Sequence, residues 1–576
     1  MKTEISIKML PLFFIALLIL ASNNFITYSY PQLPVPREET VVFGADTPFT
    51  IFDSANPFIP HGTQWFSGLQ QIGTEWCWYY DWATGKVIYW RITGWEYKDN
   101  FTTLILHVRK GVTWNDGHPF TARDIVFTIN MLKEHPQLYW GPYMAEWVES
   151  AEAPDNYTAI IRLKKPNPTF HHRFRVWGGP YIVPEHVWKD KDPMTFKNFP
   201  PVTTAPYKLY KVYPELKMYV WIRDENYWGK KFGYFPEPKY VIFMTVPPTD
   251  ILFREFVRGG IDVPPRIFNW EQIKLAKAVN PKIIGTAFTD GGTIGLVVNH
   301  RKYPLNLPEV RWAISYSIDR ERIAKLWPYC EGGTKPAKSP FPPWKGLEKY
   351  QYKEIFERYP LEFNITKANE ILDELGFKRG PDGIRVTPNG TRLSFVIQTT
   401  AYYGDPMYFV ALIIAENLRK IGIEASVKSV VSAVFWENQR TGKFDAYVEF
   451  LGISDMAWGL GPLAWFSQWE TPSPVELEAM KERGEVDTEW HSPELDKIIE
   501  EAEKLSPEDP RLEPLQMKGT EITWKNLPVI PVIYPIYTQA YSTQYWTGWP
   551  TKDNLYITPF TWFPHTIFIL FNLRRA

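Results

Sequence analysis

Cysteine is almost missing from this chain of 576 residues, which contains only Cys77 and Cys330. Two cysteines so far apart provide neither a zinc site nor a disulfide framework, and they form either one bridge or two buried thiols. His171 and His172 are no better as metal ligands, because neighbours on a strand point to opposite faces, and we interpret them as surface polar groups. Since H-E-x-x-H, Walker A and G-x-S-x-G motifs are also missing, we expect no metal and no cofactor.

An excess of charge of either sign is missing too. The 63 Lys and Arg residues balance 64 Asp and Glu residues and leave a formal net charge of −1. Such a chain has no overall field to attract nucleic acid or anionic lipid. We therefore expect no nucleic-acid partner.

Hydrophobic runs long enough to span a bilayer are missing as well. The apolar run near the N-terminus, from Met9 to Ala21, follows Lys2 and Lys8 and is too short for a membrane span. This pattern is typical of a secretory signal, with a retained anchor as the alternative. We assign residues 1–37 to this signal or anchor and a Pro-rich linker, and we expect an extracytoplasmic location.

Aromatic residues, in contrast, are abundant. The chain has 26 Trp, 32 Tyr and 36 Phe, which together make up 16% of its residues. Indole rings either fill hydrophobic cores or offer flat apolar platforms with a polar edge to sugars, peptides or cations. A single Trp in such a chain is more often a packing residue than a ligand platform, so the set carries more weight than any member.

The first informative pattern is a strand, a turn and a capped helix. Alternating apolar residues predict a strand over 104–108, and Asn-Asp-Gly at 115–117 predicts a turn. Thr121 and Asp124 form a capping-box pattern at the start of a helix that extends to about residue 132.

Later segments alternate between helices and strands. Strands are predicted over 294–298, 393–397 and 423–431, and helices over 308–319, 364–375 and 410–420. Such alternation favours an α/β domain with a largely parallel sheet.

Five segments together resemble one known family. Residues 114–128, with the sequence WNDGHPFTARDIVFT, carry the most specific match, and residues 310–321, 366–377, 418–423 and 442–446 agree with it in order. The chain is thereby identified as a member of the family 5 extracellular solute-binding proteins of ABC transporters, which include the dipeptide- and oligopeptide-binding proteins.

The resemblance implies a two-lobed periplasmic-binding-protein fold of class II type, with an extra inserted domain and mixed sheets flanked by helices. It also implies a monomeric receptor that is not an enzyme, closes on a solute and delivers it to the permease subunits of an importer. Membrane contact would then arise only through the N-terminal segment or the permease. The implied division is lobe I at 38–76, 200–295 and 525–576, domain II at 77–199, and lobe III at 296–524.

Ligand class is the open question within this family. Peptide-binding members pair an Asp of lobe III with the peptide ammonium group; Asp455 lies near that position, but the residues after it depart from the peptide pattern. Aromatic platforms edged by amides and carboxylates suit sugars, so we expect an oligosaccharide such as a cello- or manno-oligosaccharide, with an oligopeptide as the alternative. A secreted glycoside hydrolase, which would need two carboxylates about 5 to 10 Å apart, is the remoter alternative. The expected ligand-binding residues are Asn56, Gln64, Trp65, Glu75, Trp76, Trp270, Asn299, Trp436, Asp455, Trp458 and Trp465.

Overall fold

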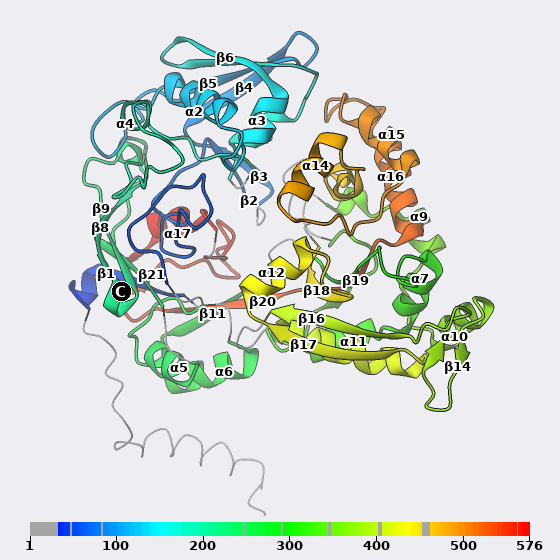
Figure 1. Ribbon diagram of the computed structural model, residues 1–576. Coiled ribbons are helices and arrows are strands. Elements are labelled where there is room, and N and C mark those ends of the chain that lie inside the picture. Colours follow the sequence, from blue (N-terminus) through cyan, green and yellow to red (C-terminus); the bar gives the residue numbers. More distant parts are fainter. Residues whose placement is uncertain are drawn as a thin grey trace, which may run out of the picture.

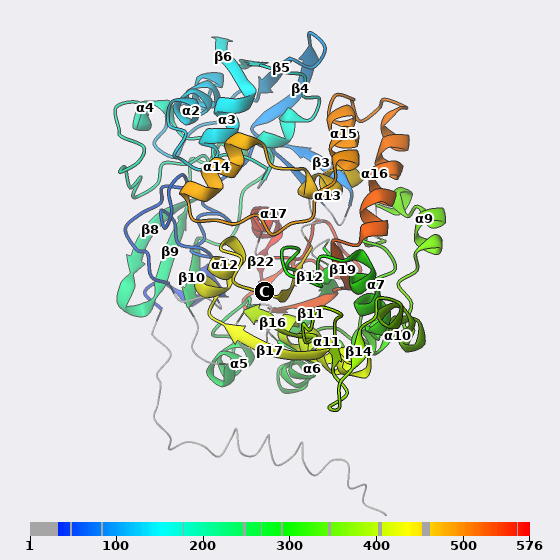
Figure 2. The same cartoon turned by 45° about the vertical axis from the view of Figure 1, so that its right-hand side comes forward.

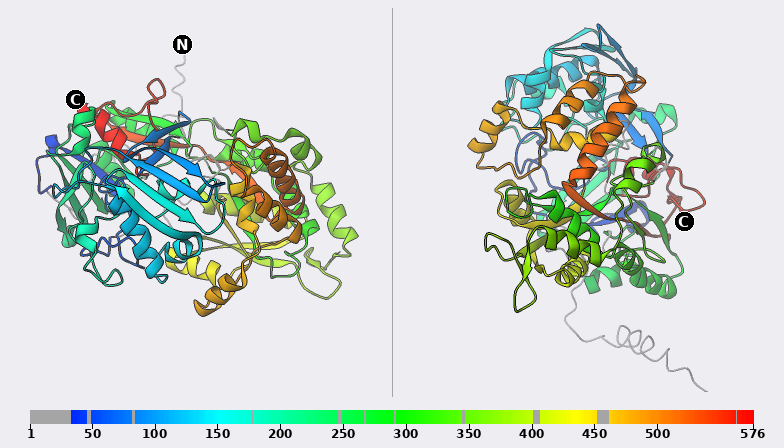
Figure 3. Two further views of the ribbon diagram at one scale, coloured as in Figure 1. Left: turned by 90° about the horizontal axis from the view of Figure 1, so that it is seen from above. Right: turned by 90° about the vertical axis from the view of Figure 1, so that its right-hand side faces the viewer.

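The computed structural model consists of two bodies that lie side by side (Figures 1 and 3). It describes residues 33–45, 49–81, 84–176, 178–245, 249–265, 268–289, 292–343, 347–400, 406–451, 461–561 and 563–576. Most of the predicted signal or anchor, residues 1–32, lies outside these ranges. Within the described ranges, no helix has both the length and the apolar character needed to cross a membrane.

The first body is built on a central sheet with the strand order β1-β10-β9-β8. Its strands are β1 (Thr40–Ala45), β8 (Tyr207–Tyr213), β9 (Met218–Arg223) and β10 (Tyr240–Thr245). β1 runs parallel to β10, with Val42 opposite Ile242, and the other pairs are antiparallel. Helices α5 (Thr249–Val257) and α6 (Trp270–Val279) cover the face that carries Val42 and Ile242.

A second, peripheral sheet belongs to the same body and has the strand order β4-β5-β7-β6. Its strands and the helices that pack on it are β4 (Ile92–Lys98), β5 (Thr103–Val108), β6 (Val148–Asp155), β7 (Thr158–Leu163), α2 (Ala122–Glu134) and α3 (Gly141–Trp147). The predicted capping box is confirmed: Thr121 Oγ1 accepts from Arg123 N at 3.3 Å, and Asp124 Oδ2 accepts from Thr121 N at 2.8 Å.

One hydrophobic core joins the two sheets of the first body. Val41 and Phe43 of the central sheet, Leu106 of the peripheral sheet and Ile569 of α17 (Thr566–Asn572) belong to the same cluster of buried side chains. The predicted domain II therefore packs against lobe I through a continuous apolar interior. The smaller elements of this body are β2 (Trp78–Asp81), β3 (Lys86–Tyr89), α4 (Glu185–Trp188), β21 (Trp546–Thr547) and β22 (Arg574–Arg575).

The second body has a six-stranded sheet with the order β13-β19-β12-β18-β16-β17. Its strands are β12 (Ile294–Val298), β13 (Lys335–Pro336), β16 (Ser394–Thr400), β17 (Glu424–Val430), β18 (Ala446–Phe450) and β19 (Val529–Tyr534). The expectation of a largely parallel sheet is wrong for this body. Only β16 runs parallel to its neighbours β17 and β18, because β12 and β19 enter and leave the body in opposite directions.

Helices surround this sheet and enclose a second core, which also takes in Phe288, Tyr537, Phe560 and Phe563 from the side of the first body. They are α7 (Pro308–Ser317), α8 (Arg320–Leu326), α9 (Lys353–Arg358), α10 (Ile365–Glu374), α11 (Pro406–Lys420), α12 (Ser432–Arg440), α13 (Pro462–Phe466), α14 (Pro474–Glu482), α15 (Pro493–Ala502) and α16 (Leu512–Asn526), together with the short hairpin of β14 (Lys378–Arg379) and β15 (Arg385–Val386). The predicted helices α7, α10 and α11 are confirmed within a few residues of their expected bounds.

Two chain crossings connect the bodies. β11 (Ile283–Phe288) and β20 (Tyr537–Ser542) pair antiparallel on the side of the first body, and each continues directly into a strand of the six-stranded sheet, β12 and β19 respectively. The implied division puts β19 in lobe I, which would include residues 525–576, but the pairing of β19 with β12 places this strand in the second body. The return crossing therefore falls at residues 535–536.

Candidate functional site

A small hollow lies at the carboxyl end of β1, where open α/β sheets commonly bind ligands. Its volume is about 20 Å³, room for about one water molecule. Phe43 and Phe243 stack at its base with ring centroids 4.7 Å apart. The full lining consists of Phe43, Gly44, Ala45, Phe66, Phe243, Pro264, Pro265 and Thr561.

The wall of this hollow is tied to the crossing strand β20. Gln539 of β20 is buried, and its amide nitrogen donates to the carbonyl of Pro264 at 3.3 Å. Its amide oxygen accepts from the hydroxyl of Thr561 at 3.4 Å. The hollow is therefore positioned by the same strand that carries the chain between the two bodies.

Trp65 stands beside the hollow as an exposed indole. Its exposed fraction is 45%, and its ring meets the Phe66 ring edge-on at 5.4 Å. The neighbouring Gln64 is buried and anchors this segment, because its side-chain oxygen accepts from the backbone N–H groups of Thr50 and Ile51 at 2.7 and 3.0 Å. Gln64 thus supports the segment that presents Trp65.

On the second body, α12 follows β17 and lies on the side turned toward the first body (Figure 1). Trp436 of α12 has an exposed fraction of 47%, similar to that of Trp65. Phe435, its neighbour, is buried and packs edge-on against Tyr447 of β18 at 5.7 Å. The helix is therefore anchored in the core of the second body while Trp436 remains available to a ligand.

The peripheral sheet also meets the second body, as the closeness of α14 to α3 in Figures 1 and 2 indicates. Burial, together with the Glu470 carboxylate, raises the pKa of Glu503 to about 7, and Lys165 and Arg173 of the first body act in the opposite direction. Glu503 in turn acts electrostatically on Tyr143 of α3. The two bodies therefore interact both at the crossings and through this charged contact.

Asn56 and Asn299 lie within the interior of separate bodies. The Asn56 amide donates to the carbonyls of Pro193 and Phe196 at 2.9 and 2.7 Å, and its oxygen accepts from Phe58 N. Asn299 donates to the carbonyls of Gly442 and Phe444 and accepts from Arg301 N. Both residues are 2% exposed or less. Their side-chain amides form hydrogen bonds with the protein backbone and not with the hollow.

Glu75, another predicted ligand-binding residue, is also buried, and it connects segments of the first body. Its carboxylate accepts from Trp90 Nε1 at 2.8 Å, Tyr227 Oη at 2.5 Å and Trp228 Nε1 at 3.0 Å. Burial raises the pKa of this carboxyl, while the three hydrogen bonds lower it. The geometry is that of a structural centre joining distant segments of the first body.

The remaining predicted tryptophans lie away from the hollow. Trp76 is buried against Tyr181 with ring centroids 4.9 Å apart, and Trp465 is buried edge-on against Phe341 at 5.4 Å. Trp270 begins α6 and packs with the cluster on the opposite face of the central sheet from Phe43 and Phe243, because alternate strand residues face opposite sides. Asp455 and Trp458 lie outside the described residues.

The interpretation of His171 and His172 as surface groups is wrong. Both rings are buried in a short 3₁₀ helix, Phe170–Phe174, where they pack on Trp78. The two cysteines are free and buried in different bodies.

Sequence reasoning missed the residues that line the hollow. Phe43, Gly44 and Ala45 form the last part of β1, and the carboxyl end of a strand is a signal for a ligand site in open α/β sheets. Thr561 and Gln539 have no local pattern that links them, because only the folded chain brings residues 22 positions apart into this hydrogen bond.

The fold and the paired crossings define a two-lobed solute-binding protein. Among solved structures, a periplasmic oligopeptide-binding protein of an oligopeptide ABC transporter from Thermotoga maritima superposes with a TM-score of 0.80 and 26% identity, covering 94% of this chain and 100% of that chain. Its mannohexaose-bound structure gives a TM-score of 0.79 and 25% identity, covering 94% of this chain and 99% of that chain.

The family model of the bacterial extracellular solute-binding proteins, family 5, matches residues 86–471. The chain belongs to this family. It is 23% identical over 489 residues to the periplasmic oligopeptide-binding protein OppA of Salmonella typhimurium, covering 80% of this chain and 82% of that protein. It is 24% identical over 408 residues to the uncharacterized protein y4wM of Sinorhizobium fredii, and this match spans 63% of the chain but only 60% of that relative's length.

Proposed function

We propose that this protein is an extracytoplasmic receptor of an ABC importer that captures an oligosaccharide and delivers it to the permease. The observation that carries the proposal is the pair of exposed indoles, Trp65 and Trp436, one on each of two bodies that only two chain crossings connect. The mannohexaose bound by the Thermotoga maritima structure supports a sugar ligand.

The physical basis is stacking between sugar C–H faces and indole rings. A sugar carries no net charge, so its affinity depends on apolar faces and on hydroxyl hydrogen bonds. Ligand would first dock on one body and then contact the other, which favours the closed form that the permease recognises. No bond of the solute is broken in this cycle.

An oligopeptide is the second candidate ligand. It is favoured by relatives named as oligopeptide-binding proteins, including OppA of Salmonella typhimurium. In that case the ligand ammonium group would need a carboxylate partner, and Asp455 is the residue to test first.

The test is to titrate the protein without its predicted signal segment with manno- and cello-oligosaccharides and with short peptides. Tryptophan fluorescence and calorimetry measure the binding. We expect saturable sugar binding without product formation. Trp65→Ala and Trp436→Ala should each weaken binding by roughly 2- to 10-fold, the range expected from one stacking contact. Tyr210→Ala, which removes a ring of 52% exposure from β8, is the matched control and should bind normally.

Each other outcome contradicts a defined part of the proposal. Peptide binding alone would replace the sugar with the peptide ligand. Sugar cleavage would favour the hydrolase alternative. Normal sugar binding by both tryptophan variants would show that the site lies elsewhere.

A further inference from the structure

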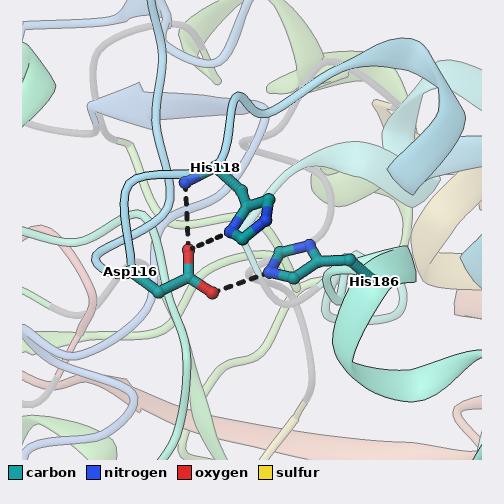
Figure 4. A group of neighbouring side chains, drawn as sticks. All are labelled: Asp116, His118 and His186. Carbon is teal, nitrogen blue, oxygen red and sulfur yellow. Dashed lines mark hydrogen bonds and ion pairs between the residues drawn. The ribbon is translucent and has the colours of Figure 1, made fainter.

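Three metal-binding side chains meet on the surface of the first body (Figure 4). Asp116 and His118 belong to the turn before α2, and His186 comes from α4, 70 residues beyond Asp116. His186 Nε2 lies 2.7 Å from Asp116 Oδ2, and His118 Nδ1 lies 3.3 Å from Asp116 Oδ1. The ligating atoms of the three residues all lie within 4.8 Å of one another.

The backbone around this cluster is held in place before any ion binds. Asp116 Oδ1 accepts from His118 N at 3.1 Å, and Trp114 N donates to the His118 carbonyl at 2.8 Å. Asn115 N donates to the carbonyl of Thr203 at 2.8 Å, which fixes the turn to the rest of the body. The two imidazole rings stack with centroids 4.0 Å apart and an interplanar angle of 23°.

The local charge also suits a cation. Within the described part of the chain, neither a lysine nor an arginine forms an ion pair with Asp116, whose partners are the two imidazoles. The nearby Arg123 is engaged by Glu185, with Nε and Oε2 3.2 Å apart. The carboxylate therefore has no permanent positive charge opposite it.

We propose that Asp116, His118 and His186 bind one divalent transition-metal ion, with Zn²⁺ as the best match. Two imidazole nitrogens and one carboxylate oxygen suit zinc, nickel or copper, whereas calcium and magnesium prefer sets made only of oxygen. In a tetrahedral zinc site with metal–ligand bonds of about 2.1 Å, the ligand atoms lie about 3.4 Å apart. Side-chain rotations that move the three ligand atoms by about 1 Å would bring them to this separation. The exposed fourth position is left to water.

The bound ion would cross-link the turn that carries Asp116 to α4. Because it binds the folded arrangement and not the unfolded chain, it should raise the melting temperature in a concentration-dependent way. This inference concerns a different surface from the solute site and does not depend on which solute the protein carries.

The experiment is a calorimetric titration with ZnCl₂, repeated with NiCl₂ and with CaCl₂. The sample is the untagged protein without its predicted signal segment, treated with a chelator beforehand. We expect one equivalent of zinc to bind and calcium to give no signal. His118→Ala, His186→Ala and Asp116→Asn should each weaken zinc binding at least tenfold, since even outer partners of metal ligands reach this effect. Asp116→Asn retains an oxygen that can accept from His118 N and so preserves the turn.

His107→Ala is the matched control. His107 is an exposed histidine 3.9 Å from the Glu96 carboxylate, and among the residues that the structure describes it belongs to no group of three metal-binding side chains. Its loss should therefore leave zinc affinity unchanged. A second readout is the visible absorption of bound Co²⁺, which should disappear in the cluster variants. The proposal is overturned if the wild-type protein takes up no zinc, or if it and the three cluster variants bind zinc equally and keep the same thermal shift.

Discussion

The two bodies of this protein are built in different ways. In the first body, the central and peripheral sheets share one continuous hydrophobic core, although the resemblance divides them into separate domains. The second body has a different core around a six-stranded sheet, and this core extends to Phe288, Tyr537, Phe560 and Phe563 on the side of the first body. Only two chain crossings, which pass from β11 to β12 and from β19 to β20, connect the two.

This difference indicates where the molecule can move. Separating the two sheets of the first body would expose buried apolar surface, which costs about 25 cal/mol for each Å². Rotation of one body against the other needs backbone changes at the crossings, for example at residues 535–536, and shifts in the apolar contacts of Phe288 and Tyr537 beside them. We therefore expect the first body to move as a unit and ligand closure to occur about the crossings.

The largest expected effect comes from Glu75→Ala in the first body. The substitution leaves the donors of Trp90 and Tyr227 buried without their acceptor, at about 1–3 kcal/mol for each group. Trp228 Nε1 keeps one acceptor, the carbonyl of Thr204 at 3.0 Å. We expect a loss of roughly 3–5 kcal/mol in the free energy of unfolding, because such penalties are not fully additive. Urea unfolding monitored by pulsed hydrogen exchange would measure the free energy of unfolding of each body separately. Peptides from residues 92–163 report on the first body, and peptides from residues 394–430 report on the second.

Arg311→Ala is the counterpart in the second body. The Arg311 guanidinium donates to the carbonyls of Leu305, Asn526 and Leu527. Its loss should destabilise residues 394–430 and leave the first body unchanged. Equal destabilisation of both bodies by either variant would contradict their independence.

Acid should affect the first body more than the second. Burial lowers the pKa of His171 and of His300 to about 3, and also lowers the pKa values of His172 and His565. The unfolded chain binds a proton on each histidine near pH 6.5. The stability from each neutral ring is thus complete above pH 6.5 and falls as the pH decreases below that value. For His171 and His300 the loss continues at about 1.4 kcal/mol per pH unit toward pH 3.

Three of these histidines lie in the first body, and only His300 lies in the second. Between pH 7 and 5.5 the first body should therefore lose more stability than the second. The same exchange experiment, with the labelling pulse at one fixed pH, measures this difference. His172→Gln should reduce the pH slope of the first body, and His300→Gln that of the second. Equal slopes in the two bodies would refute this expectation.

The smallest expected effect concerns the contact between the bodies. Burial and Glu470 raise the pKa of Glu503 to about 7, with Glu146 adding to the effect and Lys165 and Arg173 opposing it. If closure of the two bodies forms this contact, the Glu503 carboxylate takes up a proton on closure. Protonation therefore favours the closed form below pH 7, and this contribution is lost as the pH rises through about 7. Solute affinity should therefore rise a few-fold between pH 7.5 and 6.

Glu503→Gln removes the titrating group and should make solute affinity independent of pH over this range. Glu500→Gln, on the exposed part of the same helix and paired with Lys504, is the matched control and should keep the wild-type pH dependence. An unchanged pH dependence in Glu503→Gln would show that this contact does not respond to closure.

Much of the local structure was predictable from the sequence. The capping box of Thr121 and Asp124, the helix that begins at Pro308 and the left-handed Gly376 after α10, with φ of 75°, each follow from interactions within a few residues. The signature at residues 114–128 also identified the family, which the match over residues 86–471 confirms. The signature contains Asp116 and His118, but His186 approaches them only in the folded chain.

The candidate site was predictable only in part. Trp65 and Trp436 are exposed, one on each body, whereas Trp76 and Trp465 have the same side chain and are buried. The residues next to each tryptophan in the sequence do not distinguish the buried rings from the exposed ones. Burial of Trp76 depends on Tyr181 and burial of Trp465 depends on Phe341, and each partner lies more than 100 residues away in the chain.

The sequence by itself determined the elements, the family and the abundance of aromatic side chains, since these depend on residue type and short spacing. Tertiary structure alone decided that β19 joins the second body, that Glu75 is a buried acceptor for three donors and that Gln539 fixes Thr561 at the hollow. Each of these depends on contacts between distant segments, and such contacts form only when the hydrophobic cores of the two bodies have packed.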